Sequence, residues 1–149
     1  MLIPGQGHVV APGEGRVVDL GVTRMRVLAA GQDVTRGTFT LAEFSGGAGP
    51  WTVPHLHRGM EESFFVLDGE FAFTIGEQEV TGGTGSYLLV PRDTPHVLAA
   101  TTEHARCLVL MVPGGQEEMF YELGALGADS LRDPAVRAAI SARYDSVPV

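Results

Sequence analysis

The stretch PHLHRGMEESFFVLDGE, residues 54–70, contains two histidines separated by one residue, a pair of glutamates and an apolar run that ends in Asp-Gly. Alternate side chains of a β-strand point to the same side, so His55 and His57 are expected to share one face. A turn after these histidines can bring Glu62 back beside them. The stretch therefore predicts a β-structure in which two imidazoles and one carboxylate converge.

The dipeptide Asp68-Gly69 is expected to form the two-residue turn of a β-hairpin, because Asp-Gly between apolar runs adopts the positive φ angles that such a turn requires. In the resulting register Phe64 pairs with Phe73, and Glu62 lies on the same apolar face. Burying an unpaired carboxylate is costly, so the fold should place a cation or a metal ion beside Glu62.

A third histidine, His96, begins a later apolar run after the sequence GSYLLVPRDTP, in which two prolines mark a turn. Three histidines and a glutamate with open coordination positions form a mixed nitrogen and oxygen site that suits divalent Fe, Mn, Co, Ni, Cu or Zn. Glu61 competes with Glu62 as the carboxylate ligand, and strand alternation favours Glu62. The expected metal ligands are therefore His55, His57, Glu62 and His96.

The rest of the chain consists of short apolar or alternating runs separated by Gly, Pro and Asp at intervals of about ten residues, which is typical of an all-β sandwich or barrel. Strands are expected at residues 17–20, 25–29, 38–44, 51–57, 63–67, 70–75, 79–81, 86–90, 96–100 and 106–112. Helices are expected only towards the end, over residues 116–123 and from an N-cap at Asp133 to about Tyr144. The sequence thus predicts a single domain, residues 1–149.

Composition and charge limit the classes of partner. The chain has 149 residues, of which 44% are apolar and 19% charged, as in an ordinary globular domain. Its net charge is −8 and it has no lysine, which argues against nucleic-acid and membrane-surface partners because both require a positive face. We expect a small-molecule substrate or a protein partner instead. The single cysteine, Cys107, is expected to be a buried, inert thiol. The N-terminus has no signal-like pattern, so a cytoplasmic location is expected.

The histidines and glycines of this sequence resemble the two motifs of the cupin superfamily. The first motif, G(x)5HxH(x)3–4E(x)6G, is matched in full by Gly49, His55, His57, Glu62 and Gly69. The second, G(x)5PxG(x)2H(x)3N, is matched by Gly85, Pro91 and His96, whereas Asp93 replaces the usual Gly and Ala100 replaces the usual Asn. The runs PGG, EEMFYELG and SARYD also resemble the tails of small single-domain bacterial cupins.

This resemblance implies a double-stranded β-helix, or jelly-roll barrel, with the metal inside it. The barrel core would cover about residues 36–113, and a helical tail would cover about residues 116–145. Cupins with three histidines and one glutamate include dioxygenases, cyclases, lyases, isomerases and domains without known chemistry. Fe, Mn or Ni is the expected metal, with Zn, Co or Cu as alternatives.

An apolar, aromatic barrel interior suits a planar aromatic or polyketide-like substrate better than a sugar phosphate, which requires Lys or Arg. The leading hypothesis is a quercetinase-like dioxygenase acting on an aromatic or enolisable molecule, with Glu62 as a ligand or as the catalytic base. The alternatives are a redox-neutral cyclase, isomerase or lyase, and a non-enzymatic binding module. Candidate substrate-pocket residues are Trp51, Met60, Phe73, Tyr87 and Met111.

The outward face of the expected hairpin carries an apolar strip formed by Phe65, Leu67 and Ala72. Such a strip is unfavourable in water, and a second subunit packed against it would bury apolar area. We therefore expect a homodimer. The alternative is that the N-terminal strands, residues 17–29, cover the strip within one chain and leave a monomer.

Overall fold

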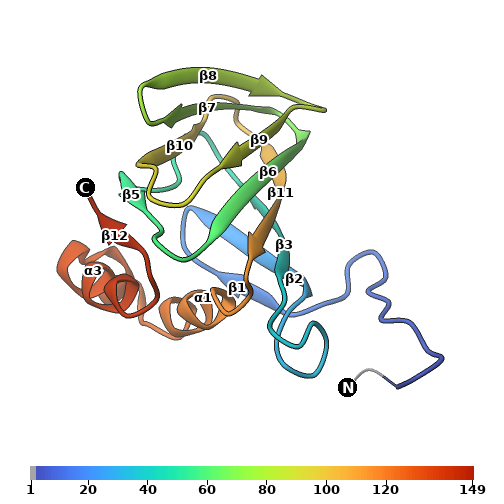
Figure 1. Cartoon of the computed structure of the whole chain (residues 1–149). Coiled ribbons are helices and arrows are strands. Elements are labelled where there is room, and N and C mark those ends of the chain that lie inside the picture. The colour runs from blue at the N-terminus through green and yellow to red at the C-terminus, as the bar shows by residue number, and fades with distance from the viewer. Residues whose placement is uncertain (1–2) are drawn as a thin grey trace.

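The computed structural model describes residues 3–149 and consists mainly of two antiparallel sheets that face each other (Figure 1). The first sheet has the strand order β1 (Val17–Asp19), β2 (Thr23–Ala29), β3 (Thr40–Gly46), β11 (Ala105–Val112), β6 (Glu61–Asp68) and β9 (Tyr87–Val90). The second has the order β12 (Val147–Pro148), β5 (His55–Leu56), β10 (His96–Ala100), β7 (Glu70–Ile75) and β8 (Gln78–Gly83), with β4 (Gly49–Pro50) paired to β10. The all-β jelly-roll barrel expected from the sequence is confirmed.

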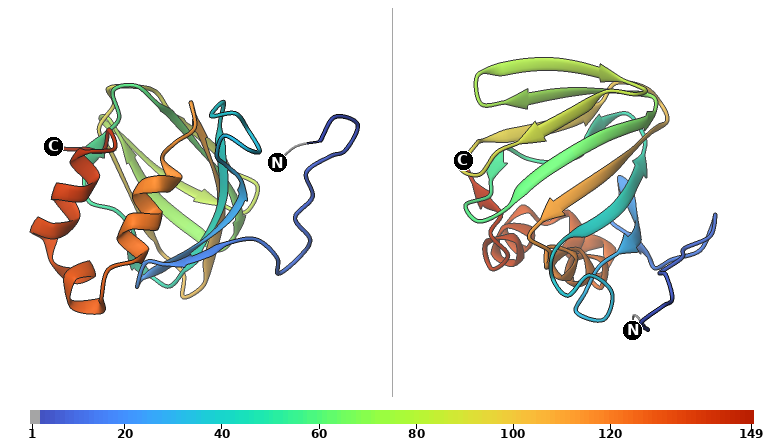
Figure 2. Two further views of the ribbon diagram at one scale, coloured as in Figure 1. Left: turned by 90° about the horizontal axis from the view of Figure 1, so that it is seen from below. Right: turned by 45° about the vertical axis from the view of Figure 1, so that its right-hand side comes forward.

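Three short helices, α1 (Glu117–Gly124), α2 (Ala128–Arg132) and α3 (Pro134–Ala142), follow the barrel strands and lie together beside it (Figure 2). The Asp133 side chain caps α3 by accepting a hydrogen bond from the Ala135 N–H, as the Asp-Pro signal predicts. The five-residue helix α2 was not expected, because so short a segment carries no helical periodicity. The two-residue strand β12 was not expected either.

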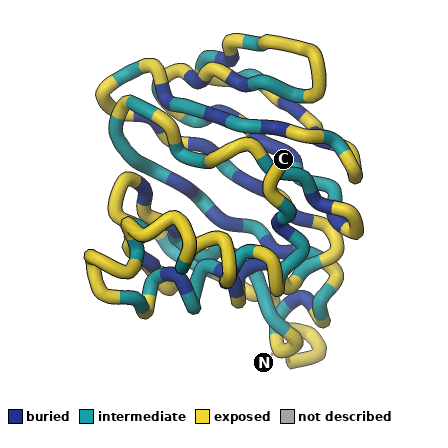
Figure 3. The backbone as a smooth tube through the Cα atoms, turned by 90° about the vertical axis from the view of Figure 1, so that its left-hand side faces the viewer, coloured by how far each residue is buried: buried dark blue, intermediate teal, exposed yellow. Residues whose placement is uncertain are grey.

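The core lies between the two sheets, and buried residues alternate with more exposed ones along several strands (Figure 3), because alternate side chains of a strand point to opposite faces. Its most deeply buried large side chains are Phe71, Met25, Met111, Val66 and Val90. Cys107 also lies inside, and burial raises the pKa of its thiol to about 12, which agrees with the expected inert cysteine.

The expected hairpin at Asp68-Gly69 is wrong, because β6 and β7 belong to different sheets. Gly69, with φ 73°, carries the chain from one sheet to the other, and a side chain there would clash with the His104 carbonyl. Phe64 and Phe73 therefore meet across the barrel interior, with ring centroids 5.3 Å apart, and are not neighbours on adjacent strands. The predicted inward faces are nevertheless correct, since alternation along each strand does not depend on the pairing partner.

The continuous strand expected over residues 51–57 is also wrong. Only Gly49–Pro50 and His55–Leu56 pair with β10, and the segment between them is irregular. Pro54 has no N–H to donate, which is consistent with a break in the ladder before His55.

Among residues 3–149, no helix has both the length and the apolar character needed to cross a membrane.

Candidate metal centre

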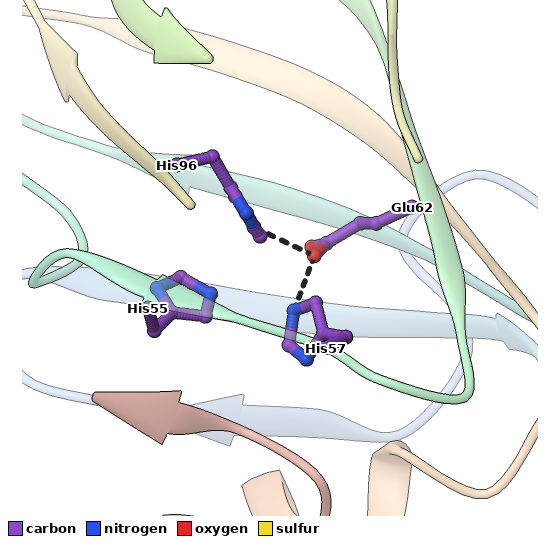
Figure 4. A group of neighbouring side chains, drawn as sticks. All are labelled: His55, His57, Glu62 and His96. Atoms are coloured by element: carbon purple, nitrogen blue, oxygen red, sulfur yellow. Dashed lines mark hydrogen bonds and ion pairs between the residues drawn. The ribbon is translucent and has the colours of Figure 1, made fainter. Parts of the chain in front are cut away.

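The three motif histidines and Glu62 come together inside the barrel from both sheets (Figure 4). His55 is on β5 and is paired directly with His96, the first residue of β10. His57 follows β5, and Glu62 projects from β6 of the opposite sheet. One potential ligand atom from each of these residues lies within 4.8 Å of all the others.

Each of the three imidazoles is held through its Nδ1 atom by a backbone carbonyl. The acceptors for His55, His96 and His57 are the carbonyl oxygens of Val53 (2.7 Å), Thr94 (3.0 Å) and Asp145 (2.7 Å), respectively. A carbonyl oxygen can only accept, so each Nδ1 must carry the proton. The Nε2 atoms of neutral imidazoles in this arrangement are therefore free to act as ligands.

Glu62 accepts hydrogen bonds at Oε2 from the Nε2 atoms of His57, at 2.9 Å, and His96, at 3.3 Å. Burial by itself lowers the pKa of His57, but the hydrogen bond to Glu62 and its negative charge outweigh this and raise the pKa above 6.5. Burial likewise tends to raise the pKa of Glu62, yet the hydrogen bonds from His57 and His96 lower it to about 2. When His57 is protonated, the metal-free cluster contains an ion pair between His57 and Glu62, in which the Nε2 proton occupies a position that a metal ion requires.

The environment of His55 lowers the pKa of its imidazole, in contrast to that of His57. Burial and the nearby charge of His96 lower the pKa of His55 to about 4, so its imidazole is neutral at physiological pH. A neutral imidazole is the form that binds metal, which makes His55 a preformed ligand.

The donor set fits a divalent transition-metal ion. Ligands on opposite sides of an ion with bonds of about 2.1 Å are about 4.2 Å apart, so the observed spread of 4.8 Å needs only a small contraction. Three neutral imidazoles and one carboxylate provide the nitrogen and oxygen donors that Fe, Mn, Co, Ni, Cu and Zn accept. His55, His57, Glu62 and His96 would hold such an ion.

Glu61, the competing carboxylate, lies outside this cluster. Its Oε1 accepts a hydrogen bond from Arg92 Nε at 2.9 Å, and its side chain is 41% exposed. The Glu62 side chain is 13% exposed and points inward. Strand alternation thus distinguished the two neighbouring glutamates correctly.

The two departures from the second cupin motif are accommodated locally. Asp93 adopts the left-handed conformation expected of the usual glycine, with φ 58°, and its N–H donates to the His57 carbonyl at 2.7 Å. Ala100 is buried and pairs with Phe71 and Gly49. The turn before His96 is therefore kept without the glycine.

The candidate pocket residues do not all lie inside the barrel. Met60, Phe73 and Met111 are buried, and Met111 is paired with Glu62 across β11 and β6. Trp51 is half-buried, with its ring 4.8 Å from that of Phe71. Tyr87 is wrong as a pocket residue: it lies on the outer face of β9 and is 63% exposed.

Sequence reasoning missed two residues next to the cluster. Val90, paired with Glu62 across β9 and β6, is almost completely buried, and alternation along its run could have identified it. Asp145 contacts His57 from a position 88 residues later in the chain. Neither spacing nor composition contains a signal for such a contact.

Comparison with known proteins agrees with this architecture. A family model described as "Cupin domain" matches residues 40–113, which include all four candidate ligands. The chain belongs to the cupin superfamily.

Quercetin 2,3-dioxygenase from Bacillus subtilis (strain 168) is 31% identical over 117 residues, which cover 78% of this chain and 34% of the relative. The chain thus spans about a third of the length of that relative. Among solved structures, KdgF from Halomonas sp. superposes with a TM-score of 0.66 at 16% identity, covering 76% of this chain and 99% of the other. Pac13 from Streptomyces, described as a nucleoside dehydratase, gives 0.61 at 12% identity and covers 76% and 88%.

Proposed function

We propose that the protein is a metal-dependent dioxygenase that acts on an aromatic or enolisable small molecule. The observation that carries this proposal is the convergence of three Nδ1-anchored histidines and Glu62 on one point inside an apolar barrel. The likeness to a quercetin 2,3-dioxygenase supports the same reaction class.

A divalent ion bound by the cluster would supply a Lewis acid that stabilises an enolate or phenolate oxygen of the substrate. The three histidines are oriented through their backbone acceptors, so their Nε2 atoms need little rearrangement for binding. Glu62 is ionised at neutral pH and is available as a fourth ligand or as the acceptor of the substrate hydroxyl proton.

The side chains around the cluster favour an uncharged, planar substrate. Met111 and Val90 flank Glu62 on the neighbouring strands, and Phe73 lies on the facing sheet. No arginine is among the buried side chains of residues 3–149, so the described interior has no guanidinium group to bind a phosphate. Apolar walls with a few polar groups at one point are typical of small-molecule sites.

The test is oxygen consumption by the Fe, Mn, Ni, Co and Zn forms with flavonols and related enols. We expect at least one redox-active form to consume oxygen in proportion to substrate, and the variant Glu62→Gln to reduce the rate at least about tenfold. Glu61→Gln is the matched control, because Glu61 lies outside the cluster and contacts Arg92. The proposal fails if no metal form consumes oxygen with any of these substrates.

The donor set also supports a second candidate, a redox-neutral cyclase, isomerase or lyase. Three histidines and a carboxylate accept zinc as readily as a redox-active metal, and Lewis-acid chemistry needs no oxygen. Turnover of an enolisable substrate by the zinc form under anaerobic conditions would favour this candidate. A metal form that is coordinatively closed and binds no substrate would instead indicate a non-enzymatic binding module.

A further inference from the structure

The three histidines among the candidate ligands differ in where their Nδ1 acceptors come from. Val53 and Thr94 each lie two residues before the histidine that they orient. The acceptor for His57 is the carbonyl of Asp145, which is 88 residues away in sequence. The orientation of this one imidazole therefore depends on the segment 143–149, here called the C-terminal strap.

The Asp145 side chain binds the loop that connects two of the candidate ligands. Its Oδ1 accepts from the Arg58 N–H at 2.9 Å, and its Oδ2 accepts from the Gly59 N–H at 2.8 Å. Arg58 and Gly59 lie between His57 and Glu62 in sequence. One residue thus holds both the His57 ring and the backbone that sets its distance from Glu62.

The strap is itself fixed at several points. Asp145 has φ 57°, a left-handed conformation in which Asp and Asn are enriched among non-glycine residues. Beyond it, β12 pairs with β5 (Figure 1), with Val147 opposite Leu56 and Pro148 opposite His55. Before it, the Tyr144 hydroxyl donates to Glu122 on α1 at 2.7 Å. These contacts place the strap along the strand that carries His55.

We propose that the C-terminal strap is part of the metal site and that Asp145 is a positioning residue for His57. The inference rests on the metal centre of the proposed function. The Asp145 carbonyl holds the Nδ1 proton of His57 and directs Nε2 towards the metal position, while the carboxylate fixes the loop to Glu62. Metal affinity then depends on the strap, and by linkage metal binding stabilises the docked strap.

The test compares metal affinity in the wild-type protein, Asp145→Ala, Asp145→Asn and a chain that ends at Tyr144. Dissociation constants for Co²⁺ and Zn²⁺ are measured by competition with a chromophoric chelator, and the visible spectrum of the Co²⁺ form reports ligand geometry. Asp133→Ala is the matched control, because it removes one side-chain to backbone hydrogen bond at the start of α3 without touching the cluster. Circular dichroism verifies that each variant is folded.

We expect Asp145→Ala and the shortened chain to bind Co²⁺ about 10- to 100-fold more weakly with an altered visible spectrum, and Asp133→Ala to bind within about twofold of wild type. Asp145→Asn preserves the shape of the side chain and one acceptor oxygen, so its Co²⁺ affinity should lie between those of Asp145→Ala and the wild-type protein. This variant provides the test if the other Asp145 variants do not fold. Equal affinities and unchanged spectra in all variants would overturn the role of the strap while leaving the metal centre intact. Absence of Co²⁺ binding by the wild-type protein would overturn the metal centre, and the strap proposal with it.

Discussion

Two aspartates in left-handed backbone conformations hold His57 from different directions. The Asp93 N–H donates to the His57 carbonyl, and the Asp145 carbonyl accepts from the His57 ring. The two differ in what their side chains do. Asp145 binds two backbone N–H groups, whereas Asp93 makes only a long, exposed contact with Arg58 at 3.8 Å. Side-chain hydrogen bonds therefore offset the unfavourable left-handed conformation at Asp145 but not at Asp93.

Replacing Asp93 by glycine should stabilise the fold by up to about 1 kcal/mol. A left-handed conformation costs an ordinary residue about 1–2 kcal/mol, and the greater freedom of glycine in the unfolded chain offsets part of the gain. The lost ion pair with Arg58 contributes little because both side chains are exposed. Urea unfolding measures the change. Asp145→Gly is the comparison variant. It should destabilise the fold, because the two hydrogen bonds from the Arg58 and Gly59 N–H groups are lost. Stabilisation of the fold by both substitutions would contradict this reasoning.

Metal affinity should fall as pH decreases, because a metal ion needs the unprotonated Nε2 of each histidine. The pKa of His57 is raised above 6.5 and that of His55 is lowered to about 4, so protons compete for His57 at higher pH than for His55. We expect apparent affinity to decline from about neutral pH and the metal to be released near pH 4. Chelator competition between pH 4 and 8 tests this; retention of metal at about pH 4 would argue strongly against the site.

The metal-free protein should show a different pH dependence of stability. The raised pKa of His57 gives a contribution that is complete below 6.5 and is lost as pH rises through the folded value. The lowered pKa of Glu62 gives a contribution that is present above 4.5 and is lost as pH falls through about 2. The His57–Glu62 pair therefore stabilises most between about 4.5 and 6.5. The lowered pKa of His55 opposes this, because it removes stability as pH falls from 6.5 towards 4. Bound metal stabilises most above this range. Thermal unfolding with and without chelator should show this difference, and parallel curves would contradict it.

At the scale of strands and turns, the largest difference between expectation and structure concerns Gly69. Local sequence signals describe a turn but not the sheet to which each flanking strand belongs. The Asp-Gly dipeptide has the required positive φ at Gly69, yet the chain uses it to change sheets. The close approach of the His104 carbonyl explains why a glycine is needed there.

Gly69→Ala should destabilise the fold by at least about 2 kcal/mol. The added methyl group would meet the backbone of His104 and Ala105, and φ 73° is itself unfavourable for alanine. Gly85→Ala is the matched control: its φ is 90°, but no atom lies within 4 Å of the added methyl group, so only the conformational cost of about 1–2 kcal/mol remains. Urea unfolding of both variants measures the difference, and equal losses would show that steric contact at the sheet change is unimportant.

The candidate site was more predictable from the sequence than the topology was. Alternation and spacing pointed to His55, His57, Glu62 and His96, which the structure brings together, and favoured Glu62 over Glu61, because these properties are local. The pairing of β6 with β9 and β11 depends on contacts between segments that are distant in the chain. A single sequence does not show which of these strands pair or in which register. The Asp145 contact is missed for the same reason, whereas the exposure of Tyr87 follows from the same alternation that places Val90 inside.

At the scale of the whole molecule, the outer face of the first sheet has a broad apolar surface. Its exposed members on β6, β9 and β11 are Phe65, Tyr87, Leu89, Leu110 and Val112, here called the outer patch. The expected strip needs correction, because Ala72 lies on β7 in the other sheet. The N-terminal strands do not cover Phe65: β1 and β2 extend the same sheet beyond β3, and Phe65 remains 42% exposed.

We predict that the outer patch is the contact surface of a homodimer. Packing two such faces together removes apolar area from water, at about 25 cal/mol per Å². Light scattering should give a mass of about twice 15.8 kDa, and Phe65→Glu should reduce it to that of one chain without loss of fold. Ala72→Glu, on the outer face of the other sheet, is the control and should leave the dimer unchanged. A wild-type mass near that of one chain at micromolar concentration would refute the dimer.

The dependence of His57 on Asp145 also has a consequence for biosynthesis. Translation proceeds from the N-terminus at about 5–20 residues per second, so the roughly 30 residues that separate β11 from Asp145 take about 2–6 s to add. All the strands that carry candidate ligands are synthesised before the carbonyl that orients His57. The ligand geometry therefore cannot be complete until Asp145 has been added to the chain, because its carbonyl oxygen is the acceptor for His57 Nδ1.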